Sequence, residues 1–254
     1  RIPEALAGTL TIPALWSLCR ELIGRRSDQS TPPSDGEYVL SSLLGLGSGF
    51  GLAILYWHIS LSRVAIEPIL TPLFTCLSFA VLIRAMDSGR PRDFALAGAL
   101  FAGCMYTYKA SYAVPLLAAL FLAFCAFRDQ TLLRRHWRGL LLMAFLALVL
   151  YSPMIGYAIT RPDEFFLRFR SVTVESRFTP QIDLGANILS VLGMFFVQGD
   201  RTIWYNIPLR PALDPLMAIL FVVGLGRSVL WLKDTRRGLP LVWPLPGDDL
   251  VRAL

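Results

Sequence analysis

The sequence predicts an all-α fold, a polytopic bundle of transmembrane helices, on three observations. Hydrophobic residues make up 55% of the 254 residues and charged residues only 17%, whereas roughly 25% charged is usual in soluble domains. Several apolar runs approach the roughly 20 residues that span a bilayer. The basic residues cluster at the ends of these runs. A very apolar soluble helical bundle is the alternative for this composition.

The apolar runs predict about seven spans in this chain, with one long polar break between the last two. We expect that break, residues 161–214, to be a long extracytoplasmic loop that carries amphipathic helices. The chain therefore reads as a multi-pass protein of the plasma membrane. The predicted spans are Ile2–Leu18, Tyr38–Ile59, Pro68–Ile83, Phe94–Tyr106, Tyr112–Phe127, Gly139–Ile159 and Pro215–Leu232.

The second span and the long loop contain further local sequence signals. The second is rich in Gly and Ser at close spacing, which permits close helix approach in lipid and places it inside the bundle. Within the long loop, Asp163–Arg170 alternates charged and aromatic residues and is predicted as an interfacial helix. Asn187–Val197 is predicted as a second helix, half sunk in the membrane, which ends at Gly199.

The distribution of basic residues predicts the orientation. Clusters of Arg and Lys follow the first, third, fifth and seventh spans in short segments. The positive-inside rule counts such short loops and discounts long ones. It places these clusters in the cytoplasm and residues 161–214 outside. The net charge of +6 is thus a topology signal, and we expect no nucleic-acid partner.

The four cysteines lie singly within apolar runs, at Cys19, Cys76, Cys104 and Cys125. None has the spacing of a metal site or of a redox pair. They are interpreted as small buried apolar residues. The sequence predicts no required metal and no cofactor.

Cationic and hydrogen-bonding side chains gather on the predicted extracytoplasmic face. Each has an ordinary explanation alone: an interface anchor, a member of the aromatic belt, a turn former or a helix cap. Together they suit a phosphate carried by a lipid of the outer leaflet, held by charge-assisted hydrogen bonds. The groups that converge there are Arg1, His58, Arg63, Lys109 and Arg210, beside a loop that carries Asp200 and Asn206.

Four motifs, in order along the chain, resemble a known family. Residues 1–11 resemble R-x-x-S-A-x-x-G-x-L-T, with Glu4 in the place of Ser, and residues 57–63 resemble W-H-I-x-x-S-R. Residues 106–110 resemble Y-T-Y-x-A. Residues 199–214 resemble G-D…N-x-P-G-R-P-x-L-D, with Leu209 in the place of the second Gly. The chain thus resembles the GT-C membrane glycosyltransferases, of the protein O-mannosyltransferase and lipid A aminoarabinose transferase type (bacterial glycosyltransferase family 39).

The resemblance implies transfer of a sugar from a polyprenyl-phosphate donor to a protein, lipid or glycan acceptor outside the cytoplasm, with inversion. Arg1 would contact the donor phosphate, and His58, Arg63, Tyr108 and Lys109 would line the same cavity. Asp200, Asn206, Arg210 and Asp214 would shape the acceptor side or hold the loop. The general base is an Asp on a loop that would precede Arg1, so the catalytic residue itself is unknown in this chain.

The resemblance extends to about Arg237, so residues 1–237 are predicted to form one partial domain without the family's first span and first extracytoplasmic loop. Residues 238–254 are predicted as a truncated or irregular tail, and this stretch alone is expected to be inactive. Two alternatives stay open: a lipid-linked oligosaccharide carrier or polymerase, and a non-enzymatic subunit of a membrane bundle. An acidic residue on the loop upstream of Arg1 would distinguish the enzyme from the carrier or polymerase. A non-enzymatic subunit would tolerate Arg1→Ala and Arg63→Ala without loss of any sugar transfer.

Overall fold

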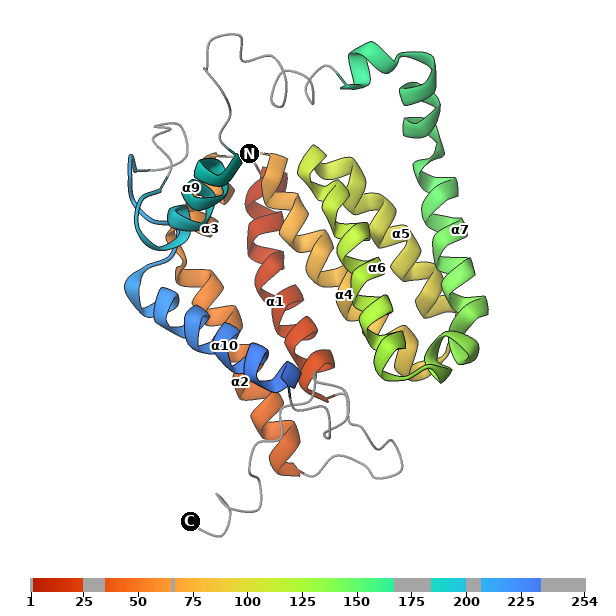
Figure 1. Ribbon diagram of the computed structural model, residues 1–254, viewed down its shortest axis with the longest axis horizontal. Coiled ribbons are helices and arrows are strands. Elements are labelled where there is room, and N and C mark those ends of the chain that lie inside the picture. The colour runs from red at the N-terminus through yellow and green to blue at the C-terminus, as the bar shows by residue number, and fades with distance from the viewer. Residues whose placement is uncertain (1, 25–34, 65–66, 167–183, 200–206, 234–254) are drawn as a thin grey trace.

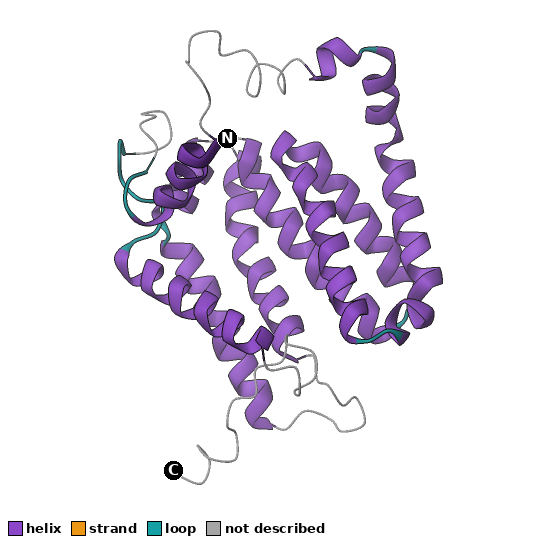
Figure 2. Ribbon diagram, viewed as in Figure 1, coloured by secondary structure: helices purple, strands orange, loops and turns teal. Residues whose placement is uncertain are grey.

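A computed structural model describes residues 2–24, 35–64, 67–166, 184–199 and 207–233. Within these ranges the chain forms helices joined by short turns and contains no strand (Figures 1 and 2). The all-α prediction is therefore confirmed. The helices are α1 (Ile2–Gly24), α2 (Asp35–Ile54), α3 (Tyr56–Val64), α4 (Leu70–Ser88), α5 (Pro91–Thr107), α6 (Ala113–Arg128), α7 (Thr131–Thr160), α9 (Leu184–Phe196) and α10 (Pro215–Lys233), with 3-10 turns η1 (Glu67–Ile69) and η2 (Lys109–Tyr112).

Four of the described helical segments are long and apolar enough to cross a membrane, namely Ile2–Leu22, Leu70–Ser88, Lys109–Phe127 and Thr131–Thr160. A fifth is obtained if the bent pair α2 and α3 counts as one span. The chain thus has the helices of a multi-pass membrane protein. Helix α5, with 17 residues, and the apolar part of α10, Pro215–Arg227, are shorter. They lie where the fourth and seventh spans were expected, and their crossing stays a prediction.

The second predicted span is not one straight helix. It bends by 58° between α2 and α3, and the break falls at Leu55, whose N–H donates to the Leu52 carbonyl at 3.2 Å. On α2, Gly45 and Gly49 are buried against α1, as small interface residues should be. The opposite face, with Leu46 and Phe50, is exposed. The helix therefore lines the edge of the bundle and does not lie at its centre.

The core lies among α4, α5 and α6, with α1 and α7 packed on either side (Figure 1). Its fully buried members include Leu82, Ile83 and Ala97. Cys76, Cys104 and Cys125 are also buried, which confirms their apolar role, and Cys19 is half-buried.

Successive long helices run in alternating directions (Figure 1). As a result, the short turns that follow α4 and α6 lie at the same end of the bundle as the end of α1, and these are the segments with basic clusters. Helix α3, η2 and the end of α7 lie at the other end. The sequence-based separation of charged ends therefore matches the helix arrangement.

Helix α3 sits directly on the first turns of α1. The ring Nε2 of His58 donates to the Gly8 carbonyl at 2.9 Å, and His58 is buried. A Cβ at Gly8 would lie only 2.5 Å from Ser62 Cβ, closer than real side chains approach. The first two motifs therefore contact each other, because His58 and Ser62 of the second motif pack against Gly8 of the first.

Substitution of Gly8 by Ala should therefore displace α3 and break the His58 hydrogen bond. We expect a loss of about 1–3 kcal/mol of stability, as for other overpacked interfaces, measured by thermal unfolding of the purified protein in detergent. Gly47→Ala is the matched control, since nothing lies within 4 Å of a Cβ at that position. Equal unfolding midpoints for the two variants would show that α3 does not need the close approach.

Candidate functional site

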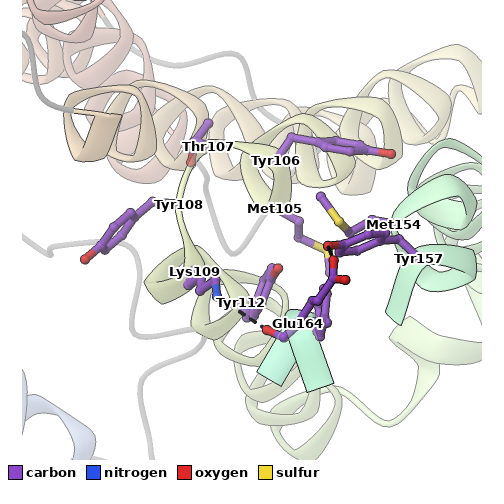
Figure 3. A pocket seen from close by; sticks show the side chains of 10 residues that line it. Met105, Tyr106, Thr107, Tyr108, Lys109, Tyr112, Met154, Tyr157 and Glu164 are labelled. Carbon is purple, nitrogen blue, oxygen red and sulfur yellow. Dashed lines mark hydrogen bonds between the residues drawn. The ribbon is translucent and has the colours of Figure 1, made fainter. Parts of the chain in front are cut away.

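A cavity of about 340 Å³ opens where α5 and α7 end (Figure 3). These helix ends lie opposite the helix ends that carry the basic clusters (Figure 1). The cavity lies between the last turn of α5, η2, the last turns of α7 and a helical turn at residues 162–166. Its volume falls at the lower end of the roughly 300–1,000 Å³ typical of small-molecule sites. Its lining comprises Met105, Tyr106, Thr107, Tyr108, Lys109, Tyr112, Met154, Tyr157, Glu164 and Phe165.

Unequal helix lengths create this cavity. Helix α7 has 30 residues and α5 has 17, so at ~1.5 Å per residue α7 is longer by about 20 Å. It continues past the end of α5, and the helical turn that follows it packs back onto η2 (Figure 1). The cavity is the space beneath this overhang.

A proline shapes the overhanging part of α7. Pro153 has no N–H, so the Val149 carbonyl loses its helical donor. The Ser152 hydroxyl donates to that carbonyl at 2.8 Å, and the Tyr106 hydroxyl donates to the neighbouring Leu150 carbonyl at 3.0 Å. Such replacement donors let a proline persist in a helix surrounded by lipid. The second of them also ties α7 to the last turn of α5.

Aromatic rings form the wall between η2 and α7. The Tyr151 hydroxyl donates to the Tyr112 hydroxyl at 3.0 Å, and the two rings pack edge to face. Tyr112 stacks on Phe165 with ring centroids 6.5 Å apart and planes 14° apart. Tyr157 meets Phe165 edge to face. Side chains of this kind offer flat apolar surface together with hydroxyl groups.

The cavity carries one cation and one carboxylate on its lining. Lys109 Nζ donates to the Phe165 carbonyl at 3.4 Å, a long hydrogen bond. Glu164 accepts from the Tyr157 hydroxyl at 2.7 Å and from Arg161 at 2.9 Å. A lysine ammonium binds phosphate, and a carboxylate accepts from hydroxyl or ammonium groups. The arrangement therefore suits a head group with an anionic part and a hydrogen-bond donor.

Two of the sequence-predicted phosphate ligands, Tyr108 and Lys109, line this cavity. His58 and Arg63 are not among its lining residues: His58 faces Gly8, and Arg63 is exposed on the last turn of α3. Arg1, the fifth predicted ligand, lies outside the described residues. The side chains predicted to share one cavity are thus only partly brought together.

A second polar cluster joins the loop before α10 to the start of α3. Arg210 lies over the Tyr56 ring, 4.2 Å from its centroid, and donates to Asp214 at 2.9 Å. The Ile207 N–H donates to the Tyr56 hydroxyl at 3.1 Å. Arg210 and Asp214 therefore hold this loop on the bundle, one of the roles that the resemblance implies. Asp200 and Asn206 lie outside the described residues.

Leu209 replaces the Gly that the resembling family has in this loop, and its backbone has φ of +66°. L-residues other than glycine adopt this left-handed region only at a cost of about 1–2 kcal/mol. The turn is held nonetheless, since the Gly199 N–H donates to the Leu209 carbonyl at 3.1 Å. The glycine of the motif is thus explained by backbone geometry.

Tyr157 and Glu164 are among the cavity residues that were not predicted from the sequence. Glu164 was included in the predicted interfacial helix Asp163–Arg170, of which the structure describes only residues up to 166, in helical form. Its position three residues after Arg161 gives an i,i+3 ion pair, which is an ordinary surface pattern. No sequence signal distinguished it from a solvent-facing charge.

In the described parts of the chain, no three His, Cys, Asp or Glu side chains are placed to hold a metal ion. The sequence-based expectation that no metal is required stays a prediction.

Leu209→Gly should stabilise the protein, because it relieves the left-handed strain. We expect a gain of about 0.5–1 kcal/mol, since the greater freedom of glycine in the unfolded chain offsets part of the relief. Thermal unfolding of the purified protein measures it. Leu213→Gly is the control: Leu213 has no positive φ, so this variant should be destabilised. Destabilisation of both variants to the same extent would show that the left-handed backbone at Leu209 is not strained.

Comparison with known proteins adds no identification: no family model, no curated protein and no solved structure matches this chain. Functional assignment therefore depends on the chain's own residues and their arrangement.

Proposed function

We propose that this chain belongs to a membrane glycosyltransferase that moves a sugar from a polyprenyl-phosphate donor to an acceptor outside the cytoplasm, with inversion. The observation that supports it is the cavity at one end of the bundle, where Tyr108 and Lys109 of the third motif line a space of about 340 Å³. Two further features support the proposal. The cavity lies at the level expected for lipid head groups, and it lies at the end of the bundle opposite the basic clusters.

The donor phosphate binds at Lys109 in this proposal. The Lys109 ammonium has three donors, and its hydrogen bond to the Phe165 carbonyl is long at 3.4 Å. A phosphate oxygen is a stronger acceptor than a carbonyl because it is charged. Since the cavity lies at the ends of helices long enough to cross a bilayer, a lipid-borne phosphate reaches it at head-group depth. Arg1 and Arg63 are proposed to contribute charge from the same end.

The orientation follows from the basic clusters. The described helix ends with Arg84, Arg90 and Arg92, and with Arg134, Arg135 and Arg138, lie opposite the cavity (Figure 1). Positive residues in short loops mark the cytoplasmic side. The cavity is therefore proposed to face outward, where a lipid-linked sugar serves as donor in place of a nucleotide sugar.

Transfer is proposed to proceed as one displacement. The bond between the anomeric carbon and the phosphate oxygen breaks, and its electron pair stays on that oxygen. A new bond forms between the anomeric carbon and the acceptor oxygen, whose proton passes to a general base. By the resemblance that base is an Asp on a loop preceding Arg1. Lys109 stabilises the charge that develops on the leaving phosphate.

Lys109→Gln should weaken binding of polyprenyl phosphate to the protein in lipid nanodiscs by about tenfold, the size of one charged hydrogen bond. Native mass spectrometry of the complexes measures it. Arg134→Gln removes a charge at the opposite end and is the control. If both variants bind like the parent, the cavity does not hold the phosphate, and a non-enzymatic subunit becomes the better assignment.

The orientation predicts which engineered cysteines react from outside the cell. Asp163→Cys, beside the cavity, should label with a membrane-impermeant maleimide in intact cells. Gln130→Cys, in the turn between α6 and α7, should label only after permeabilisation, and the parent protein corrects for its own cysteines. The reverse pattern would place the cavity in the cytoplasm and remove the argument for a polyprenyl-phosphate sugar.

A further inference from the structure

The cavity contains a charged group that the proposed phosphate contact does not use, the carboxylate of Glu164. It is held at the rim by the Tyr157 hydroxyl at 2.7 Å and by Arg161 at 2.9 Å. A carboxylate offers about four lone-pair sites, so two acceptors remain beside these contacts. Figure 3 shows Lys109 on η2 and Glu164 on the helical turn reaching the same cavity from two different segments.

We propose that Glu164 makes this cavity select the sugar-loaded lipid over the spent polyprenyl phosphate. This inference rests on the proposed function, because it needs the phosphate at Lys109. It assigns Glu164 as a specificity-determining residue that recognises the sugar and disfavours the product.

The first part of the argument is hydrogen bonding. In the donor the sugar is bonded directly to the phosphate, so a phosphate at Lys109 places the ring in the rest of the same 340 Å³ space. That space has Glu164 on its lining, which accepts from sugar hydroxyls, and the stacked pair of Tyr112 and Phe165, whose flat surfaces suit the apolar face of a ring. A bare phosphate lipid makes none of these contacts.

The second part is charge. The donor is a phosphate diester with one negative charge. Transfer leaves a monoester, which carries about −1.5 to −2 at neutral pH if its second pKa is near 6, as in phosphorylated side chains. The cavity lining supplies one ammonium, Lys109, and one carboxylate, Glu164. Within the described lining, the added negative charge of the product is repelled by Glu164 and meets a single cation, Lys109, while Arg1 and Arg63 are proposed to act from outside this lining.

Arg161 does not cancel this effect. Its ion pair with Glu164 has side chains 63% and 55% exposed, so water weakens this pair and, equally, the repulsion between Glu164 and a phosphate. Hydrogen bonding to the sugar therefore carries the larger part of the preference. Arg161 is also not among the residues that line the cavity. Its contact orients the carboxylate, and the free lone pairs of Glu164 still face a ligand.

Four lipids of equal chain length separate charge from sugar contacts. They are polyprenyl phosphate, polyprenyl methyl phosphate, polyprenyl phosphoryl glucose and polyprenyl phosphoryl mannose. We expect the protein in nanodiscs to bind at least one glycosyl diester about tenfold more tightly than the monoester, the size of one hydrogen bond to a charged group. The methyl diester, which has the lower charge and no sugar, should lie between them.

In Glu164→Gln this preference should fall to about twofold or less, because the amide neither repels the monoester nor accepts as strongly. Asp163→Asn is the matched control, since it removes the same charge one residue away from a side chain outside the cavity lining; it should keep the parent's preference. Unchanged thermal unfolding midpoints would show that both variants are folded.

The outcomes separate the two proposals. If Glu164→Gln keeps the full preference, or if the parent prefers neither glycosyl diester, the inference about Glu164 is overturned. If Lys109→Gln binds all the lipids as the parent does, the phosphate site and with it the proposed function fail. Loss of the preference in Glu164→Gln, with weaker binding of every lipid in Lys109→Gln, supports both.

Discussion

The close packing of α7 against α5 is the constraint on which the cavity depends. At Gly98 on α5, an added Cβ would collide with the backbone carbonyl of Met143 on α7, and at Gly139 on α7 it would collide with the Phe94 ring. These small residues bring the two helices into backbone contact, as is usual where lipid supplies no hydrophobic drive between helices. Because these contacts and the Tyr106–Leu150 hydrogen bond fix the register of the two helices, the last turns of α7 project past the end of α5, and the space beneath them becomes the site.

The lipid environment of these helices also explains why several polar side chains of the motifs stabilise the fold by donating hydrogen bonds to backbone carbonyls. Backbone carbonyls in lipid need donors from the protein, since water is absent. Pro153 leaves the Val149 carbonyl without its helical donor, and Ser152 replaces it. His58 donates to the Gly8 carbonyl of α1. His58 was expected beside a phosphate, but in this structure its Nε2 proton is already used to seat α3.

The order of the helices and the helix ends that carry basic residues could be predicted from the sequence, because the length of an apolar run and a cluster of basic residues are local properties. It also marked position 209, where the family glycine corresponds to a left-handed backbone. The 58° bend at Leu55 could not be predicted, since it depends on the fit of Ser62 against Gly8, about fifty residues away. Glu164 was missed for the opposite reason: its local pattern is that of a surface ion pair, and only the return of the helical turn onto η2 gives it a cavity.

The two polar clusters at this end of the bundle differ in the partners that hold their cations. Arg210 has an ion pair with Asp214 and the face of Tyr56, so its charge is largely matched within the loop. Lys109 makes a long hydrogen bond to a carbonyl, an acceptor without formal charge. Of these two cations, Lys109 is the one that lines the cavity. One ammonium matches the single negative charge of a phosphate diester, and a neighbouring carboxylate opposes any further charge. The proposed preference for a lipid phosphate that still carries its sugar rests on this pairing of Lys109 and Glu164 on the described lining.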